Sequence, residues 1–138
     1  MRAHFQQRQQ GVMLLEALIA ILIFSVGILA LVAMQGLAIN YTSEAKYRSD
    51  AGFLASEIIS QMWVDRTNLA NYAYPGGTAP ELANWVTKIN NTLPQAATNP
   101  PTITVDVPTG TVDVTVRWLP PNAEAARNYR TIAVVSNP

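Results

Sequence analysis

An uninterrupted apolar run marks the first part of the chain. Residues 17–34 contain no charged side chain, and Ser25 carries the one hydroxyl among them. As a helix that rises ~1.5 Å per residue, this run spans about 27 Å, close to the ~30 Å hydrocarbon thickness of a bilayer. The pattern therefore predicts a helix that can cross a membrane.

Farther along the chain the apolar positions narrow to one stripe. They recur at spacings of three and four, which is typical of a helix with one buried face. These positions are Ala51, Leu54, Ala55, Ile58, Ile59 and Met62. Because no proline occurs before Pro75, we expect a single helix from residue 12 to about residue 66. Glu44 and Arg48 are spaced to pair on its wet face.

A loop and a second, shorter helix are predicted next. Pro75, Gly76 and Gly77 are strong turn signals, and they place a loop over residues 68–80. The following segment has the spacing of a short amphipathic helix, which Pro94 closes. Its apolar positions are Leu82, Trp85, Val86, Ile89 and Leu93. We expect Trp85 to be a core residue rather than a platform for a ligand.

Near the C-terminus the apolar pattern changes to a period of two, which predicts strands. The alternating residues are Ile103, Val105 and Val107, then Val112, Val114, Val116 and Trp118. Pro108, Thr109 and Gly110 lie between the two sets and predict a hairpin turn. A third strand is predicted over residues 130–136.

The expected hairpin register brings two acidic residues together. Pairing Val107 with Val112 keeps the apolar residues of both strands on one face, and it places Asp106 opposite Asp113. Like charges directly across a strand pair are unfavourable. We therefore expect a compensating positive charge beside this pair.

Arg117, Arg130 or an adjoining subunit can supply that charge. A weakly bound cation is the alternative, although two carboxylates do not fill the six to eight oxygen positions that Ca²⁺ prefers. We predict no cofactor, no metal site and no catalytic residues.

These elements together predict an α+β fold. A long N-terminal helix, membrane-spanning in its first half and amphipathic in its second, packs on a small antiparallel β-meander. The expected organisation is a leader at residues 1–11, a hydrophobic helix at 12–36, its amphipathic continuation at 37–66 and a globular domain at 67–138. A soluble part of about seventy residues makes a marginal core, so the amphipathic half is expected to complete it.

Charge and composition exclude some classes of function. The formal net charge is +0 and the chain has no cysteine, so we predict neither nucleic acid as a partner nor disulfides or thiolate chemistry. Arg2, His4 and Arg8 precede the apolar run without any acid. The positive-inside rule then places the leader in the cytoplasm and the rest of the chain outside.

Glu16 stands directly before the apolar run. A carboxylate at that depth costs about 2.5 to 3.5 kcal/mol on insertion scales, so it requires a partner of opposite charge. Cleavage between Gly11 and Val12 would create one, because the new α-amino group of Val12 is positive and lies about one helical turn from Glu16. In a bundle, that amine could instead meet the glutamate of a neighbouring chain.

Residues 11–16, Gly-Val-Met-Leu-Leu-Glu, resemble the class III signal of type IV prepilins. The resemblance implies the pilin fold and cleavage after Gly11 by a membrane prepilin peptidase. It further implies N-methylation of Val12, and recruitment into a filament through Glu16 and a neighbour's terminal amine. Val12 departs from the family pattern, in which phenylalanine is commonest at this position.

Within that family, residues 16–35 and 47–62 resemble minor pilins of the PilV type. This implies a low-abundance subunit that primes assembly and sits at or near the pilus tip. The implied partners are other minor pilins, the major pilin, inner-membrane assembly machinery and a tip adhesin. The implied location is the bacterial inner membrane, with a single pass, a cytoplasmic N-terminus and a periplasmic domain.

Two other functions remain open at this stage. A minor pseudopilin of a type II secretion system shares the leader, the glutamate and the fold. A membrane-anchored enzyme is the remote alternative, in which a serine would act with Lys88 or Lys46.

Overall fold

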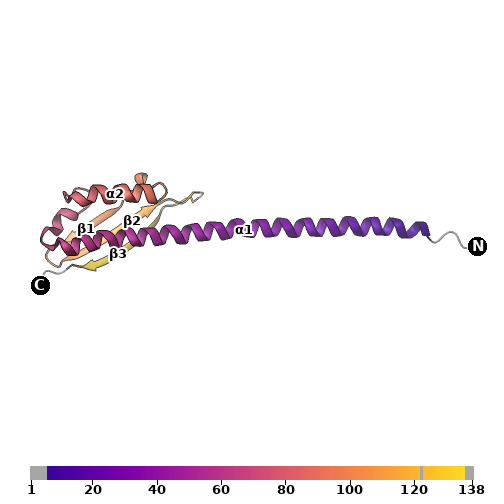
Figure 1. Cartoon of the computed structure of the whole chain (residues 1–138), viewed down its shortest axis with the longest axis horizontal. Helices are drawn as coiled ribbons and strands as arrows, with labels where there is room; N and C mark the ends of the chain where they lie inside the picture. Colours follow the sequence, from indigo (N-terminus) through magenta and orange to yellow (C-terminus); the bar gives the residue numbers. More distant parts are fainter. Residues whose placement is uncertain (1–5, 122, 136–138) are drawn as a thin grey trace, which may run out of the picture. The chain divides into compact units, whose positions relative to one another are not determined.

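The computed structural model describes residues 6–121 and 123–135, with side chains from residue 11 onward. The chain divides into two units, Met1–Thr42 and Ser43–Pro138. As predicted, the fold is α+β: a long N-terminal helix, α1 (Gln6–Val64), accompanies a three-stranded antiparallel sheet (Figure 1). The helix begins before the expected residue 12, so the described end of the leader is helical as well.

The first unit consists of helix alone in the described part of the chain. Every side chain from Gly11 to Thr42 is exposed. No other element covers this half of α1, which agrees with a segment whose apolar residues are distributed around the whole helix.

In the second unit α1 carries the expected stripe. Leu54, Ile58 and Met62 are buried, with Ala51 and Ala55 beside them, while Ile59 is only partly buried. A 3₁₀ helix, η1 (Arg66–Tyr72), follows α1 and buries Leu69 and Tyr72. The predicted loop is therefore partly helical, because these two side chains reach the core only if the chain curls back after α1.

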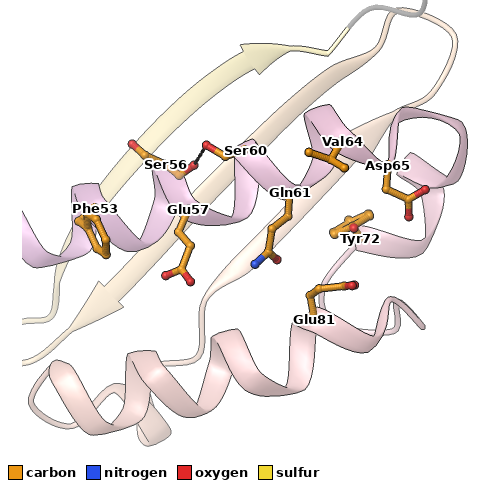
Figure 2. Close-up of a pocket in the computed structure, with 9 residues that line it drawn as sticks. All are labelled: Phe53, Ser56, Glu57, Ser60, Gln61, Val64, Asp65, Tyr72 and Glu81. Carbon is orange, nitrogen blue, oxygen red and sulfur yellow. Dashed lines mark hydrogen bonds between the residues drawn. The ribbon is translucent and has the colours of Figure 1, made fainter.

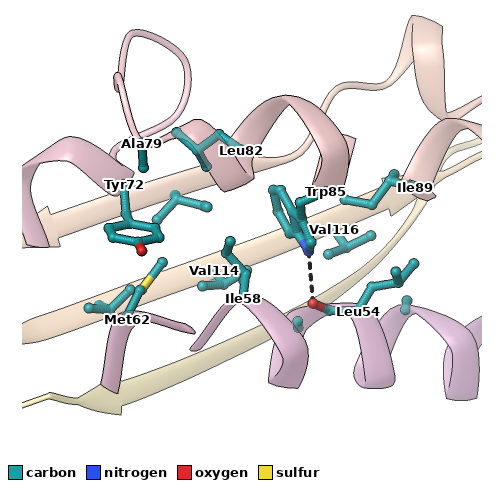
Figure 3. Packing of buried hydrophobic residues seen from close by; sticks show 14 of the residues in the cluster. Leu54, Ile58, Met62, Tyr72, Ala79, Leu82, Trp85, Ile89, Val114 and Val116 are labelled. Carbon is teal, nitrogen blue, oxygen red and sulfur yellow. Dashed lines mark hydrogen bonds between the residues drawn. The ribbon is translucent and has the colours of Figure 1, made fainter. Parts of the chain in front are cut away.

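The second helix is close to the prediction. Helix α2 (Pro80–Thr92) begins with Pro80, which lacks a backbone N–H; the first N–H groups of a helix have no partner within it, so no hydrogen bond is lost. The helix buries Leu82, Trp85 and Ile89. The Trp85 indole N–H donates a 2.8 Å hydrogen bond to the carbonyl oxygen of Leu54, which ties α2 to α1 (Figure 3). Trp85 is thus a core residue, as expected. A short 3₁₀ turn, η2 (Ala96–Thr98), follows.

The sheet is a meander of β1 (Thr102–Asp106), β2 (Thr111–Trp118) and β3 (Arg127–Val134). Strand β2 lies in the centre, and alternate side chains along it are buried. These are Val112, Val114, Val116 and Trp118. They share one core with the stripes of α1 and α2 (Figure 3). The alternation predicted the buried face of β2 correctly.

The expected hairpin register is wrong. Val105, not Val107, pairs with Val112, and Asp106 pairs with Thr111. The turn needs Val107 as well, since the Gly110 N–H donates to the Val107 carbonyl at 3.2 Å, and Gly110 has a φ of 66°. Val107 is 56% exposed. The turn has the expected length but lies one residue earlier in the chain, and this moves every residue of β2 to a β1 partner two residues earlier than expected.

The two acidic residues are consequently apart in the register. Asp113 lies opposite Thr104, while the Asp106 carboxylate accepts a 2.7 Å hydrogen bond from the Thr109 hydroxyl in the turn. The Arg130 guanidinium donates hydrogen bonds to the Asp113 carboxylate, with Nε at 3.0 Å from both oxygens and Nη2 at 2.6 Å from one. Arg130 was one of the two expected cations; the other, Arg117, donates to the Pro100 carbonyl at 3.1 Å instead.

Strand β3 begins earlier than predicted. It starts at Arg127 rather than at residue 130 and ends at Val134; the predicted end at Ser136 lies outside the described residues. Arg127 bonds Glu44 at 3.1 Å, so Glu44 has its ion pair with β3 and not with Arg48. The Tyr129 ring approaches α1 at Gly52, where a Cβ atom would meet the ring at 3.4 Å.

Replacing Ile58 with alanine should destabilise the second unit. Ile58 is completely buried, and Ile→Ala in a core typically costs about 2 to 5 kcal/mol through lost burial and the cavity left behind. Urea unfolding of the full chain in detergent micelles, followed by tryptophan fluorescence, would measure this loss. The matched variant Ile132→Ala removes a side chain that is 57% exposed and should change stability by less than about 0.5 kcal/mol. Equal losses would contradict the assigned core.

The Arg130 and Asp113 pair predicts an acid-dependent contribution to stability. The hydrogen bond from Arg130 lowers the pKa of Asp113, so the contribution is fully present above the unfolded pKa of about 3.9 and is lost as pH falls through the folded pKa. Asp113→Asn should therefore lower the urea midpoint at neutral pH, and the difference from the unaltered chain should shrink below about pH 4. A difference that is constant with pH would refute the pair's role.

Candidate functional site

The apolar first half of α1 is left uncovered by the rest of the described chain. Ile28, the least exposed of the large apolar side chains from Val12 to Ile39, still keeps 45% of its surface accessible. A contiguous apolar surface of this extent marks a place where a membrane or another protein binds.

Length and composition allow this helix to cross a membrane. Within the described residues it is the one such helix, and an 18-residue window of it reaches a mean hydropathy of 2.9 with none of its residues buried. The predicted apolar, membrane-compatible segment is therefore present as a helix.

Residues 12–34 contain two polar side chains, Glu16 and Ser25, and only Ser25 has a bonding partner in the described structure. The Ser25 hydroxyl donates a 2.7 Å hydrogen bond to the carbonyl of Ile21 one turn earlier, so its donor is satisfied within the helix. Glu16 is exposed and forms no ion pair with any described residue. Glu16 is thus the one charged side chain of residues 12–34, and no described residue pairs with it.

The predicted processing site lies next to Glu16 on the same helix. Gly11 and Val12 are both exposed, and Val12 precedes Glu16 by about one turn. The bond between Gly11 and Val12 lies inside α1, where glycine weakens the helix by about 1 kcal/mol relative to alanine. Arg2 and His4 lie outside the described residues, and the side chain of Arg8 is likewise not described.

The alternative cation site is not assembled as expected. Asp106 and Asp113 do not face each other across the hairpin, and the Asp113 carboxylate is in an ion pair with Arg130. Residues 11–121 and 123–135 contain no group of three or more His, Cys, Asp or Glu side chains that could hold a metal ion. Lys88, a candidate for the enzyme alternative, is in an ion pair with Glu57.

A groove in the second unit was missed by the sequence interpretation. It has a volume of about 660 Å³ and is lined by Phe53, Glu57, Gln61 and Val64 of α1, Tyr72 of η1 and Glu81 of α2, among others (Figure 2). One signal could have indicated it: Phe53 and Val64 are large apolar residues that fall outside the buried stripe of α1.

Negative charge gathers at one end of this groove. Burial raises the pKa of Tyr72, and the neighbouring carboxylates of Glu81 and Asp65 raise it further. The two carboxylates therefore lie close enough to the Tyr72 hydroxyl to add to the effect of burial, which is the larger cause.

Comparison with protein-family models, with curated proteins and with solved structures finds no match to this chain.

Proposed function

We propose that this chain is the precursor of a type IV pilin-like subunit, a minor pilin that helps prime pilus assembly and is located at or near the tip. The observation that carries the proposal is the position of Glu16. It is an uncompensated carboxylate five residues after Gly11, at the start of a helical apolar segment that no other part of the described chain covers.

Removal of residues 1–11 by a prepilin peptidase changes the charge balance at this end of the helix. Hydrolysis of the bond after Gly11 releases a protonated amine on Val12, and N-methylation preserves its charge. An amine and a carboxylate in a medium of low dielectric constant attract each other far more strongly than in water. A neighbouring subunit that presents its amine to Glu16 thereby removes the cost of holding this acid in lipid.

Exchange of lipid for other helices is nearly neutral for the remaining apolar side chains. Lipid tails and leucine side chains are similarly apolar, so helix–helix contacts gain little from the hydrophobic effect inside a membrane. Specific recruitment then depends on Glu16, and the work of lifting the subunit out of the bilayer comes from the ATP-driven machinery of the inner membrane.

The topology follows from the basic leader. Before processing, the N-terminus is cytoplasmic, α1 crosses the inner membrane once, and the unit Ser43–Pro138 is periplasmic. After assembly, this unit faces the outside of the filament. Its partners are the peptidase, other minor pilins, the major pilin and a tip adhesin, and its role is assembly without catalysis.

Glu16→Ala should abolish incorporation into filaments while leaving membrane insertion and leader cleavage intact. The substitution removes the counter-charge of the neighbour's amine and makes insertion into lipid easier, not harder. Immunoblots of sheared filaments and of membranes from the bacterium that carries the chain would measure both steps. Glu44→Ala, which removes an acid of the same helix outside the apolar segment, is the matched control and should be incorporated. Normal incorporation of Glu16→Ala would refute the proposed pairing.

The mature subunit should begin with methylated Val12. Cleavage after Gly11 and transfer of a methyl group to the new amine determine this terminus. Mass spectrometry of the subunit purified from membranes would identify it, and the same chain produced in cells without the peptidase should retain residues 1–11. Any other mature terminus would be incompatible with the proposal.

A further inference from the structure

The groove beside α1 has the features of a site for part of another protein chain. Its α1 wall presents residues that are spaced by three and four, next to the stripe that enters the core, and α2 and η1 form the facing wall (Figure 2). Ser56 and Ser60 stand at the edge of that wall, on the side of α1 turned away from α2, and both hydroxyls donate to the helix backbone one turn earlier (Figure 2).

Two large apolar side chains stand uncovered along the groove. Phe53 is 70% exposed and Val64 is 90% exposed, although both belong to the unit that forms the core. The fold offers neither of them a packing partner. An occupant with apolar side chains at a matching spacing would bury both.

Two oxygen atoms in the groove lack hydrogen-bond donors. Oε2 of Glu57 and Oε1 of Gln61 are both inaccessible to solvent and have no partner in the described structure. Lys88 reaches only the other oxygen of Glu57. Buried acceptors are normally satisfied, but because water does not reach these two atoms, an outside donor reaches them only if their side chains turn toward the groove.

The net charge of the groove specifies what kind of donor fits. Asp65 and Glu81 line it and form no ion pair with described residues, while the Glu57 charge is balanced by Lys88. Arg66, the nearest basic residue in sequence, lies over the Trp63 ring at 5.8 Å and does not line the groove. Lysine and arginine side chains carry positive charge and several donors, which suits the two acids.

We propose that this groove is a docking site for a segment of another protein that brings a lysine or arginine beside apolar side chains. The cation lies near Asp65 and Glu81, and the apolar side chains cover Phe53 and Val64. The inference does not rest on leader processing or on Glu16, because every residue involved lies in the unit Ser43–Pro138.

Short labelled peptides can test this with the full chain in nonionic detergent micelles. The probes are blocked peptides that alternate leucine with arginine, leucine with glutamate, and serine with arginine, and fluorescence anisotropy measures their binding. We expect saturable binding of the leucine–arginine peptide beyond that to empty micelles. Binding of the leucine–glutamate peptide with equal affinity, or no binding above empty micelles, would overturn the proposal.

Variants of the groove locate the binding. Ser60→Trp places a bulky side chain on the α1 wall and should abolish binding, and the double variant Asp65→Asn with Glu81→Gln should weaken it about fivefold, as expected for two partly exposed charges. The charge-matched control is Asp106→Asn with Glu124→Gln, neither of which lines the groove; it should bind as the unaltered chain does. Circular dichroism verifies that each variant is folded.

Two further outcomes would overturn the proposal. Unchanged affinity in both groove variants would place the peptide elsewhere. Sedimentation that shows the chain associating with itself, lost in Ser60→Trp, would make a second copy the occupant. Either result would leave the predictions for Glu16 and Val12 untouched.

Discussion

The contact between one stripe of α1 and the sheet is the interaction on which the rest of the second unit depends. Three strands of five to eight residues make a sheet with too little apolar surface to stay folded alone. Ile58 and Met62 from α1 and Trp85 from α2 cover the buried face of β2. The helix that carries the exposed apolar segment is therefore also an indispensable part of the core.

Because α1 contributes both to the exposed apolar segment and to the core, its two halves differ in sequence pattern. From Gly11 to Thr42 its side chains are all exposed and mostly apolar, whereas from Ala51 onward the apolar residues gather mainly on one face, which is buried. The change in pattern coincides with the division of the chain into two units. The proposed function uses the same division: the first part recruits through Glu16, and the second presents surfaces such as the groove to other proteins.

Periodicity predicted what it physically encodes, which is the buried face of each element. The stripe of α1, the limits of α2 within a few residues and the inward residues of β2 were confirmed. Periodicity does not encode which residue lies opposite another. The predicted register was wrong because the turn includes Val107, and Glu44 forms its ion pair with Arg127, a residue far away in sequence.

The groove could not be predicted either, since its facing walls come from segments brought together only by folding. For Gly11, Val12 and Glu16 the structure adds their helical setting and the absence of a described partner for the acid; their roles stay a prediction.

The internal hydrogen bond of Ser25 has a consequence for how precisely such a helix can be positioned. Since its hydroxyl is already occupied by Ile21, residues 17–34 present only dispersion contacts, and these are nearly equivalent at successive turns. A helix of this kind could slide past a neighbour by one turn, ~5.4 Å, with little change in energy. One acid at its end removes this near-equivalence, because it favours the single alignment in which it meets a positive charge.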